Sequence, residues 1–131
     1  MLVSLRTALL VSITATALVV GAVSVAIGGH SDLPKAPKGS VMVDHHTRTG
    51  LVAADYKIDG MSPAAVTKHY RKAFKARGFS VRSSRSSSGY SYLYMKNAGV
   101  FSFVGAGEGR RGEVHFEVCE GTDKLQVDVC G

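Results

Sequence analysis

A run of 23 residues without a charged side chain, Thr7–Gly29, constrains this chain more than any other feature. An apolar helix of about 20 residues can cross a hydrocarbon core ~30 Å thick. The run follows a short basic start, Met1–Arg6, as it does in membrane anchors and in secretory signals. We therefore predict that residues 1–29 form a signal or transmembrane segment.

Two fates of this segment remain open. A cleaved signal peptide fits the apolar region Thr7–Val20, because small-residue cleavage patterns follow at Val20–Ala22 and Ser24–Ala26. A retained anchor fits the full run, residues 7–29. Flanking basic residues are too few to fix the orientation, and we favour an inside N-terminus. We expect a single-pass protein of the bacterial inner or cell membrane with its C-terminal domain outside, or a secreted or periplasmic protein if the segment is removed.

Residues 30–50 have the composition of a linker. Pro34 and Pro37 prevent a helix and favour extended backbone in their neighbours. Val41–Val43 can begin a short strand, and Asp44–Gly50 resembles a polar turn. The ordered domain is therefore expected over residues 51–131.

The pattern of residues 51–131 predicts a small α+β domain. Leu51–Ile58 alternates as a strand does, and Ser62 and Pro63 are suited to begin a helix that Gly78 ends. We predict one helix packed on an antiparallel sheet of about 4–6 strands. The remaining strands are expected in four segments that follow the helix, with a serine-rich loop over residues 83–89: Phe79–Arg82, Tyr90–Met95, Val100–Val104 and Glu113–Val118.

The two cysteines, Cys119 and Cys130, admit two arrangements of the tail. A tight hairpin about Gly121 would turn the tail into a strand and place Cys130 roughly 20 Å from Cys119 at a rise of ~3.3 Å per residue. A disulfide requires Cα atoms within ~7 Å. Hairpin and disulfide therefore exclude each other, and we predict the disulfide, because an exported chain is oxidised.

No motif for catalysis is present. The chain lacks a nucleophile elbow, a phosphate-binding glycine loop and a zinc-type cysteine–histidine spacing. Asp44, His45 and His46 offer metal-ligand atoms, but neighbouring side chains on an extended chain point to opposite sides. We predict no enzyme, no metal and no cofactor, and keep a metal-dependent enzyme at His45 and His46 as the least favoured alternative.

Charge is strongly segregated along the chain. The net charge is +6, and no acidic residue occurs between Gly60 and Gly107. Basic and aromatic side chains together suit anionic partners. We predict that the candidate anion- or partner-binding residues are Lys68, Arg71, Lys72, Lys75, Arg82, Arg85, Tyr90 and Tyr92.

Leu51–Phe79 resembles a pattern of small bacterial cell-envelope α+β modules that carry an N-terminal membrane segment. The residues that carry this resemblance are Gly60, Met61, Ser62, Pro63, Tyr70, Arg71, Phe74, Gly78 and Phe79. The resemblance implies an anchored or secreted domain and no functional residues. We therefore expect a non-catalytic binding module, with an envelope protein as its partner. The alternative is a binder of an anionic polymer, a membrane surface or, less favoured, nucleic acid.

Overall fold

The computed structural model describes residues 33–128 and 130. The chain divides into two compact units, Met1–Asp32 and Leu33–Gly131, and only the second is described. The predicted signal or transmembrane segment, residues 1–29, lies outside the described residues. Among the described residues, no helix has the length and apolar character needed to cross a membrane.

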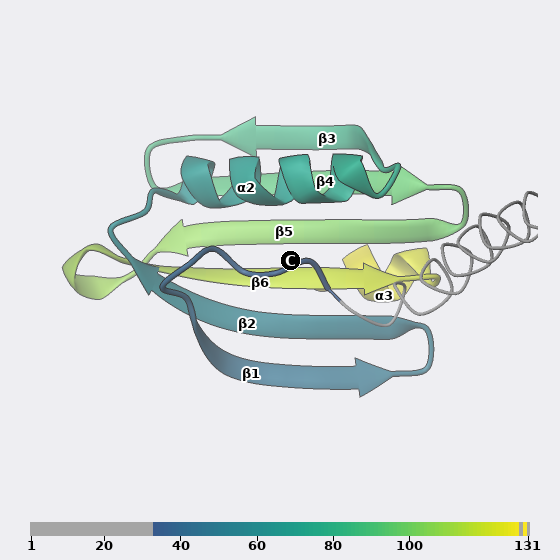
Figure 1. The fold of residues 1–131 in the computed structure, drawn as a ribbon, viewed down its shortest axis with the longest axis horizontal. Helices are drawn as coiled ribbons and strands as arrows, with labels where there is room; N and C mark the ends of the chain where they lie inside the picture. The colour runs from purple at the N-terminus through teal and green to yellow at the C-terminus, as the bar shows by residue number, and fades with distance from the viewer. Residues whose placement is uncertain (1–32, 129, 131) are drawn as a thin grey trace, which may run out of the picture. The chain divides into compact units, whose positions relative to one another are not determined.

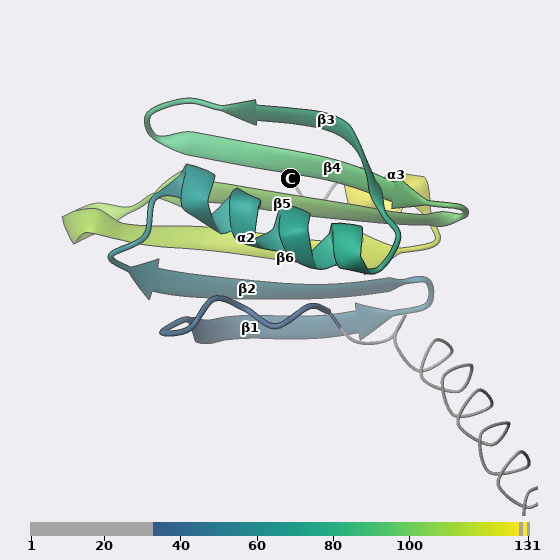
Figure 2. The ribbon, with the colours of Figure 1, turned by 45° about the horizontal axis from the view of Figure 1, so that its top comes forward.

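The second unit is built on one antiparallel sheet of six strands in the order β1-β2-β6-β5-β4-β3 (Figure 1). Helix α2 lies across one face of this sheet (Figures 1 and 2). The predicted α+β class with one helix on an antiparallel sheet is thereby confirmed. The strands are β1 (Val41–Arg48), β2 (Leu51–Asp59), β3 (Ser80–Ser86), β4 (Tyr90–Asn97), β5 (Val100–Glu108) and β6 (Glu113–Gly121).

Helix α2 (Pro63–Ala76) begins and ends where the sequence predicts. The Ser62 hydroxyl accepts a hydrogen bond from the Ala65 N–H at 3.1 Å, which satisfies one of the free donors of the first turn. Gly78 follows the helix with a φ of +89°, a conformation that costs glycine little. The apolar stripe of the helix packs on the inward side chains of the four central strands and forms the main core: Val66, Tyr70, Phe74, Leu93, Met95, Val104, Val114, Phe116 and Val118.

The predicted linker over residues 30–50 is wrong from residue 33 onward. Leu33 and Ala36 pack against the main core, and the Lys35 carbonyl oxygen lies 2.8 Å from His69 Nε2 of α2. Strand β1 then covers most of the segment predicted as a turn. Its side chains are mostly exposed, including Val41, Met42 and Val43. The predicted strand start at Val41–Val43 is confirmed, and the rest of β1 was missed because an exposed edge strand need not alternate apolar and polar residues.

The predicted serine-rich loop over residues 83–89 is also mostly a strand. Every residue of β3 is exposed, and the strand pairs with β4 at the second edge of the sheet. Serine is a weak strand former, but here the cross-strand hydrogen bonds to β4 hold the backbone extended.

We call the face of the sheet opposite α2 the open face. At one end it is covered by the C-terminal tail, whose short helix α3 (Lys124–Asp128) buries Val127 against Leu51 and Phe103. The predicted disulfide is confirmed: Cys119 and Cys130 are bonded, with a Cα–Cα distance of 6.5 Å. The tail is therefore a looped-back segment and not a seventh strand.

Candidate functional site

A basic groove runs between α2 and the edge strand β3. It has a volume of about 520 Å³. Its basic lining residues recur at helical spacing on one side of α2: Lys68, Arg71, Lys72 and Lys75. No described acidic side chain forms an ion pair with any of these four. The groove is therefore a surface of uncompensated positive charge.

A chain of hydroxyl groups forms the wall of the groove beside Ser86. Thr67 Oγ1 donates to the Ala64 carbonyl oxygen at 3.1 Å, so it accepts in its 2.7 Å contact with Ser91 Oγ. Ser91 in turn accepts from Ser86 Oγ at 2.7 Å. Because each hydroxyl has one proton, Ser86 donates inward and offers only lone pairs to the groove.

The donors of the groove are therefore its lysine and arginine nitrogens. The Arg71 Nε–H is buried and has no hydrogen-bond partner among the described residues. A buried donor without a partner costs on the order of 1–3 kcal/mol.

The structure separates the predicted anion-binding residues into two groups. The four basic residues of α2 come together, as predicted. Tyr90 and Tyr92 alternate with buried Ser91 and Leu93, so they lie on the open face, on the other side of the sheet. Arg85 lies opposite Tyr92 in the strand register and shares that face. Arg82 lies between Val81 and Ser83, where the register of the two strands shifts.

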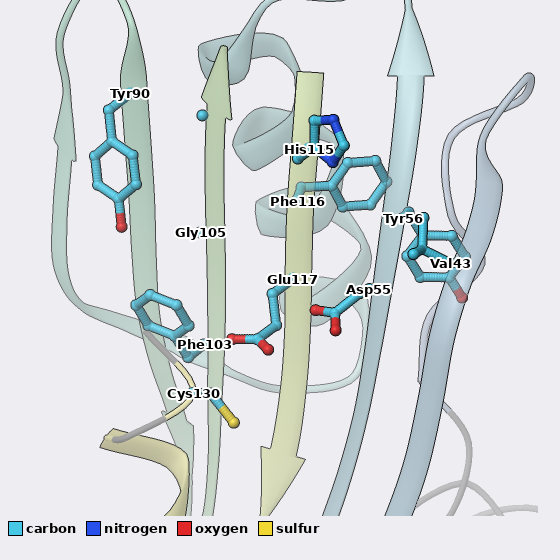
Figure 3. A pocket seen from close by; sticks show the side chains of 11 residues that line it. Val43, Asp55, Tyr56, Tyr90, Phe103, Gly105, His115, Phe116, Glu117 and Cys130 are labelled. Carbon is cyan, nitrogen blue, oxygen red and sulfur yellow. The ribbon is translucent and has the colours of Figure 1, made fainter. Parts of the chain in front are cut away.

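The open face carries a second concave region, which we call the open-face pocket (Figure 3). It has a volume of about 450 Å³. Its acidic side chains come from the central strands. Figure 3 shows the Asp55 carboxyl group between β2 and β6 and the Glu117 carboxyl group on the β5 side of β6. The rings of Tyr90 and Phe103 lie on the β4 and β5 side, and Cys130 of the disulfide lies at one end.

Asp55 and Glu117 form a carboxyl pair because β2 and β6 align them directly opposite one another. Burial is the largest cause that raises the pKa of Glu117, to about 7, followed by its hydrogen bond with Asp55 and by the charge of Asp55. Glu117 is therefore about half protonated at pH 7 and largely protonated one unit below it. Sequence reasoning missed this pair because only the strand register brings the two residues together.

Two of the described histidines lie beside carboxylate groups. His115 Nε2 lies 2.8 Å from Glu113 Oε1, and His46 Nδ1 lies 4.0 Å from Asp44 Oδ2. Glu117, Cys119 and Cys130 place ligand-type atoms near one another. Both sulfur atoms are in the disulfide, so they are not thiolates that could bind a metal.

Comparison of the chain with protein-family models finds no match, and comparison with curated proteins finds no significant match. The resemblance to small bacterial envelope modules therefore remains an expectation from sequence.

Proposed function

We propose that this protein is a non-catalytic binding module that holds an anionic partner in the basic groove between α2 and β3. One observation carries the proposal. Lys68, Arg71, Lys72 and Lys75 line one groove, and none of them is paired with a described acidic group. Like charges at helical spacing destabilise a helix by a few tenths of a kcal/mol per pair, and a bound anion would reverse that effect.

The chemistry of the groove favours an extended polyanion over a single small anion. The groove is open along the helix and presents several separate cations, whereas a site for one phosphate usually holds it with converging backbone donors. An anionic envelope polymer or an acidic protein surface offers charges at such intervals. The spacing of the four groove cations would then determine which polyanion binds, and the release of counterions would supply the affinity.

The location of the module is part of the same proposal. The uncharged run Thr7–Gly29 supports a membrane-anchored or exported protein of the bacterial envelope, and the Cys119–Cys130 disulfide is in keeping with an oxidising compartment. Mass spectrometry of the mature N-terminus would distinguish an anchored chain from a cleaved one. A mature chain found in the reducing cytosol with its thiols free would contradict the location.

Binding can be tested with the full-length chain in a non-ionic detergent and heparin as a probe polyanion. Retention should weaken steeply with salt. Lys72→Glu with Lys75→Glu should reduce the salt at which the protein elutes, because two groove cations become anions. Arg110→Glu with Arg111→Glu is the matched control: it changes net charge equally, on exposed residues remote in sequence from the groove.

Comparison of the two double variants distinguishes binding in the groove from attraction by the net charge of the protein. If the groove binds, the α2 variant should lower the slope of log affinity against log salt by about two, and the control should change it little. Equal loss in both variants, or no retention of the wild type at low salt, would refute the proposal. Repeating the assay with duplex DNA tests the nucleic-acid alternative.

A further inference from the structure

We propose that the open-face pocket is a second binding site, which takes the ammonium or guanidinium group of an organic cation at the Asp55 and Glu117 carboxyl groups. The proposal is independent of the basic groove, because the two surfaces lie on opposite faces of the sheet and carry opposite charge.

The carboxyl pair has no basic partner of its own. Among residues 33–128, no lysine, arginine or histidine side chain lies within ion-pair distance of Asp55 or Glu117. Two basic residues lie two positions from the pair on the same strands, Lys57 on β2 and His115 on β6. His115 contacts Glu113, and Lys57 forms no ion pair among the described residues. When both carboxyl groups are ionised they repel one another, so the ionised pair favours a positive ligand.

Glycine makes the pocket concave beside the pair. Gly105 is the cross-strand neighbour of Glu117 on β5. A Cβ atom at Gly105 would lie 2.9 Å from the Phe103 ring and 3.3 Å from the Tyr90 hydroxyl. The two rings therefore lean over the strand where a side chain is missing. Both rings line the pocket; Tyr90 is exposed, whereas Phe103 is only 7% exposed.

Aromatic faces beside carboxylates are suited to organic cations. Figure 3 shows the rings of Tyr90 and Phe103 nearly face-on from the pocket side, with the Glu117 carboxyl group next to Phe103. A cation over a ring face gains about 0.5–2 kcal/mol, and a guanidinium group can also donate two parallel hydrogen bonds to a carboxylate. Tyr90 is 45% exposed, so the site is open to solution.

Below about pH 7, binding of a cation at this pair should release a proton, because Glu117 is then mostly protonated and the ligand stabilises its ionised form. Affinity should therefore fall as the pH drops from 8 to about 5, by up to tenfold per unit below the pKa of Glu117, near 7. The other ionisable side chains on this face come from five of the strands and from the tail: Asp44, His46, Arg48, Lys57, Asp59, Arg85, Tyr90, Tyr92, Tyr94, Lys96, Glu113, His115, Lys124 and Asp128.

The test uses NMR of the full-length chain in a non-ionic detergent, with n-butylguanidinium as the probe. N-butylurea is the control ligand, because it has a similar shape and no charge. Titration to about 50 mM detects dissociation constants in the millimolar range. We expect shifts at Tyr90, Phe103 and the Glu117 carboxyl carbon with the guanidinium only, and an apparent pKa of Glu117 lower by at least about one unit at saturation.

Variants locate the site. Glu117→Gln and Asp55→Asn should each weaken binding about tenfold or more, since each removes one carboxylate from the pair. Glu113→Gln is the matched control, because this residue is on the same strand and the same face but contacts His115. No shift with n-butylguanidinium, equal shifts with N-butylurea, or undiminished binding in both pair variants would each overturn the proposal.

A short peptide with one arginine distinguishes two sources of the same chemistry. Tighter binding of the peptide than of n-butylguanidinium would identify the basic side chain of a protein partner as the ligand. Equal or weaker binding of the peptide would identify a small free amine or guanidine. If a pair variant fails to fold, the urea control and the pH dependence of the wild type still decide the proposal.

Discussion

Reduction of the Cys119–Cys130 disulfide should destabilise the folded unit by up to about 3 kcal/mol. The bond joins residues 11 positions apart, and closing a loop of that size lowers the entropy of the unfolded chain by an amount worth about 3 kcal/mol at 25 °C. This value is an upper limit. If the tail detaches after reduction, the folded state relaxes and the loss becomes smaller.

The state of the tail after reduction can be read from Val127, which is fully buried against the open face. Val127→Ala should cost about 1.5–2.5 kcal/mol in the oxidised chain, for two buried methyl groups and the space they leave. If the tail stays docked, the same substitution should cost a similar amount in the reduced chain. If the tail detaches, it should cost nothing there. The four measurements form a double-perturbation cycle.

Urea denaturation of the full-length chain, with and without a phosphine reductant, measures both quantities. Tyrosine fluorescence is the suitable signal, because the chain has no tryptophan and its five tyrosines lie between Tyr56 and Tyr94. A loss of 3 kcal/mol corresponds to a fall in Tm of about 12–24 °C for a unit of this size. An unchanged midpoint in a sample shown by mass to be fully reduced would refute the entropic argument.

Three further predictions concern single residues. Since the pKa of Glu117 is raised from 4.5 to about 7, its contribution favours the folded state below pH 4.5 and is lost as the pH rises through 7. After allowance for its partial exposure, this loss is about 1–2 kcal/mol, and Glu117→Gln should flatten the pH 5–8 stability profile measured by urea denaturation. Gly121→Ala should destabilise by at least about 2 kcal/mol, since its methyl group would meet the Gly50 carbonyl oxygen; Gly99→Ala, which meets no atom within 4 Å, is the control, and equal midpoints would contradict the argument. Tyr70→Phe should be neutral or stabilising in thermal denaturation, because the buried Tyr70 hydroxyl has no hydrogen-bond partner among the described residues. A loss of more than about 1 kcal/mol would indicate a partner for that hydroxyl.

Local patterns predicted the elements that bury one face. Val114, Phe116 and Val118 alternate on β6 and all reach the core, and the capping residues at Ser62 and Gly78 bound α2. The sequence predicted only the beginnings of the edge strands β1 and β3, at Val41–Val43 and Phe79–Arg82, and it missed the remainder for a physical reason. Their side chains are exposed, so no alternation of apolar residues distinguishes them from loops.

The candidate sites also differ in how far a local sequence pattern groups their residues. Lys68, Arg71, Lys72 and Lys75 share one helix face, and helical spacing alone groups them. Tyr90 and Tyr92 are close to these residues in the charge pattern, yet they lie across the sheet. The pairing of Asp55 with Glu117 depends on a register between strands that are more than 50 residues apart in sequence, and no local pattern encodes it.

The outer edge of β1 has a consequence for self-association. No described strand pairs with this edge, and a strand edge with exposed apolar side chains at Val41, Met42 and Val43 is a template onto which another extended chain can add. The register shift between Met42 and Asp44 interrupts the regular ladder within that apolar stretch. Irregular pairing of this kind twists a strand out of the flat geometry that fibrils require. The register shift thus lies within the apolar stretch of this edge, and a regular ladder there would offer another chain a longer, flatter edge for pairing.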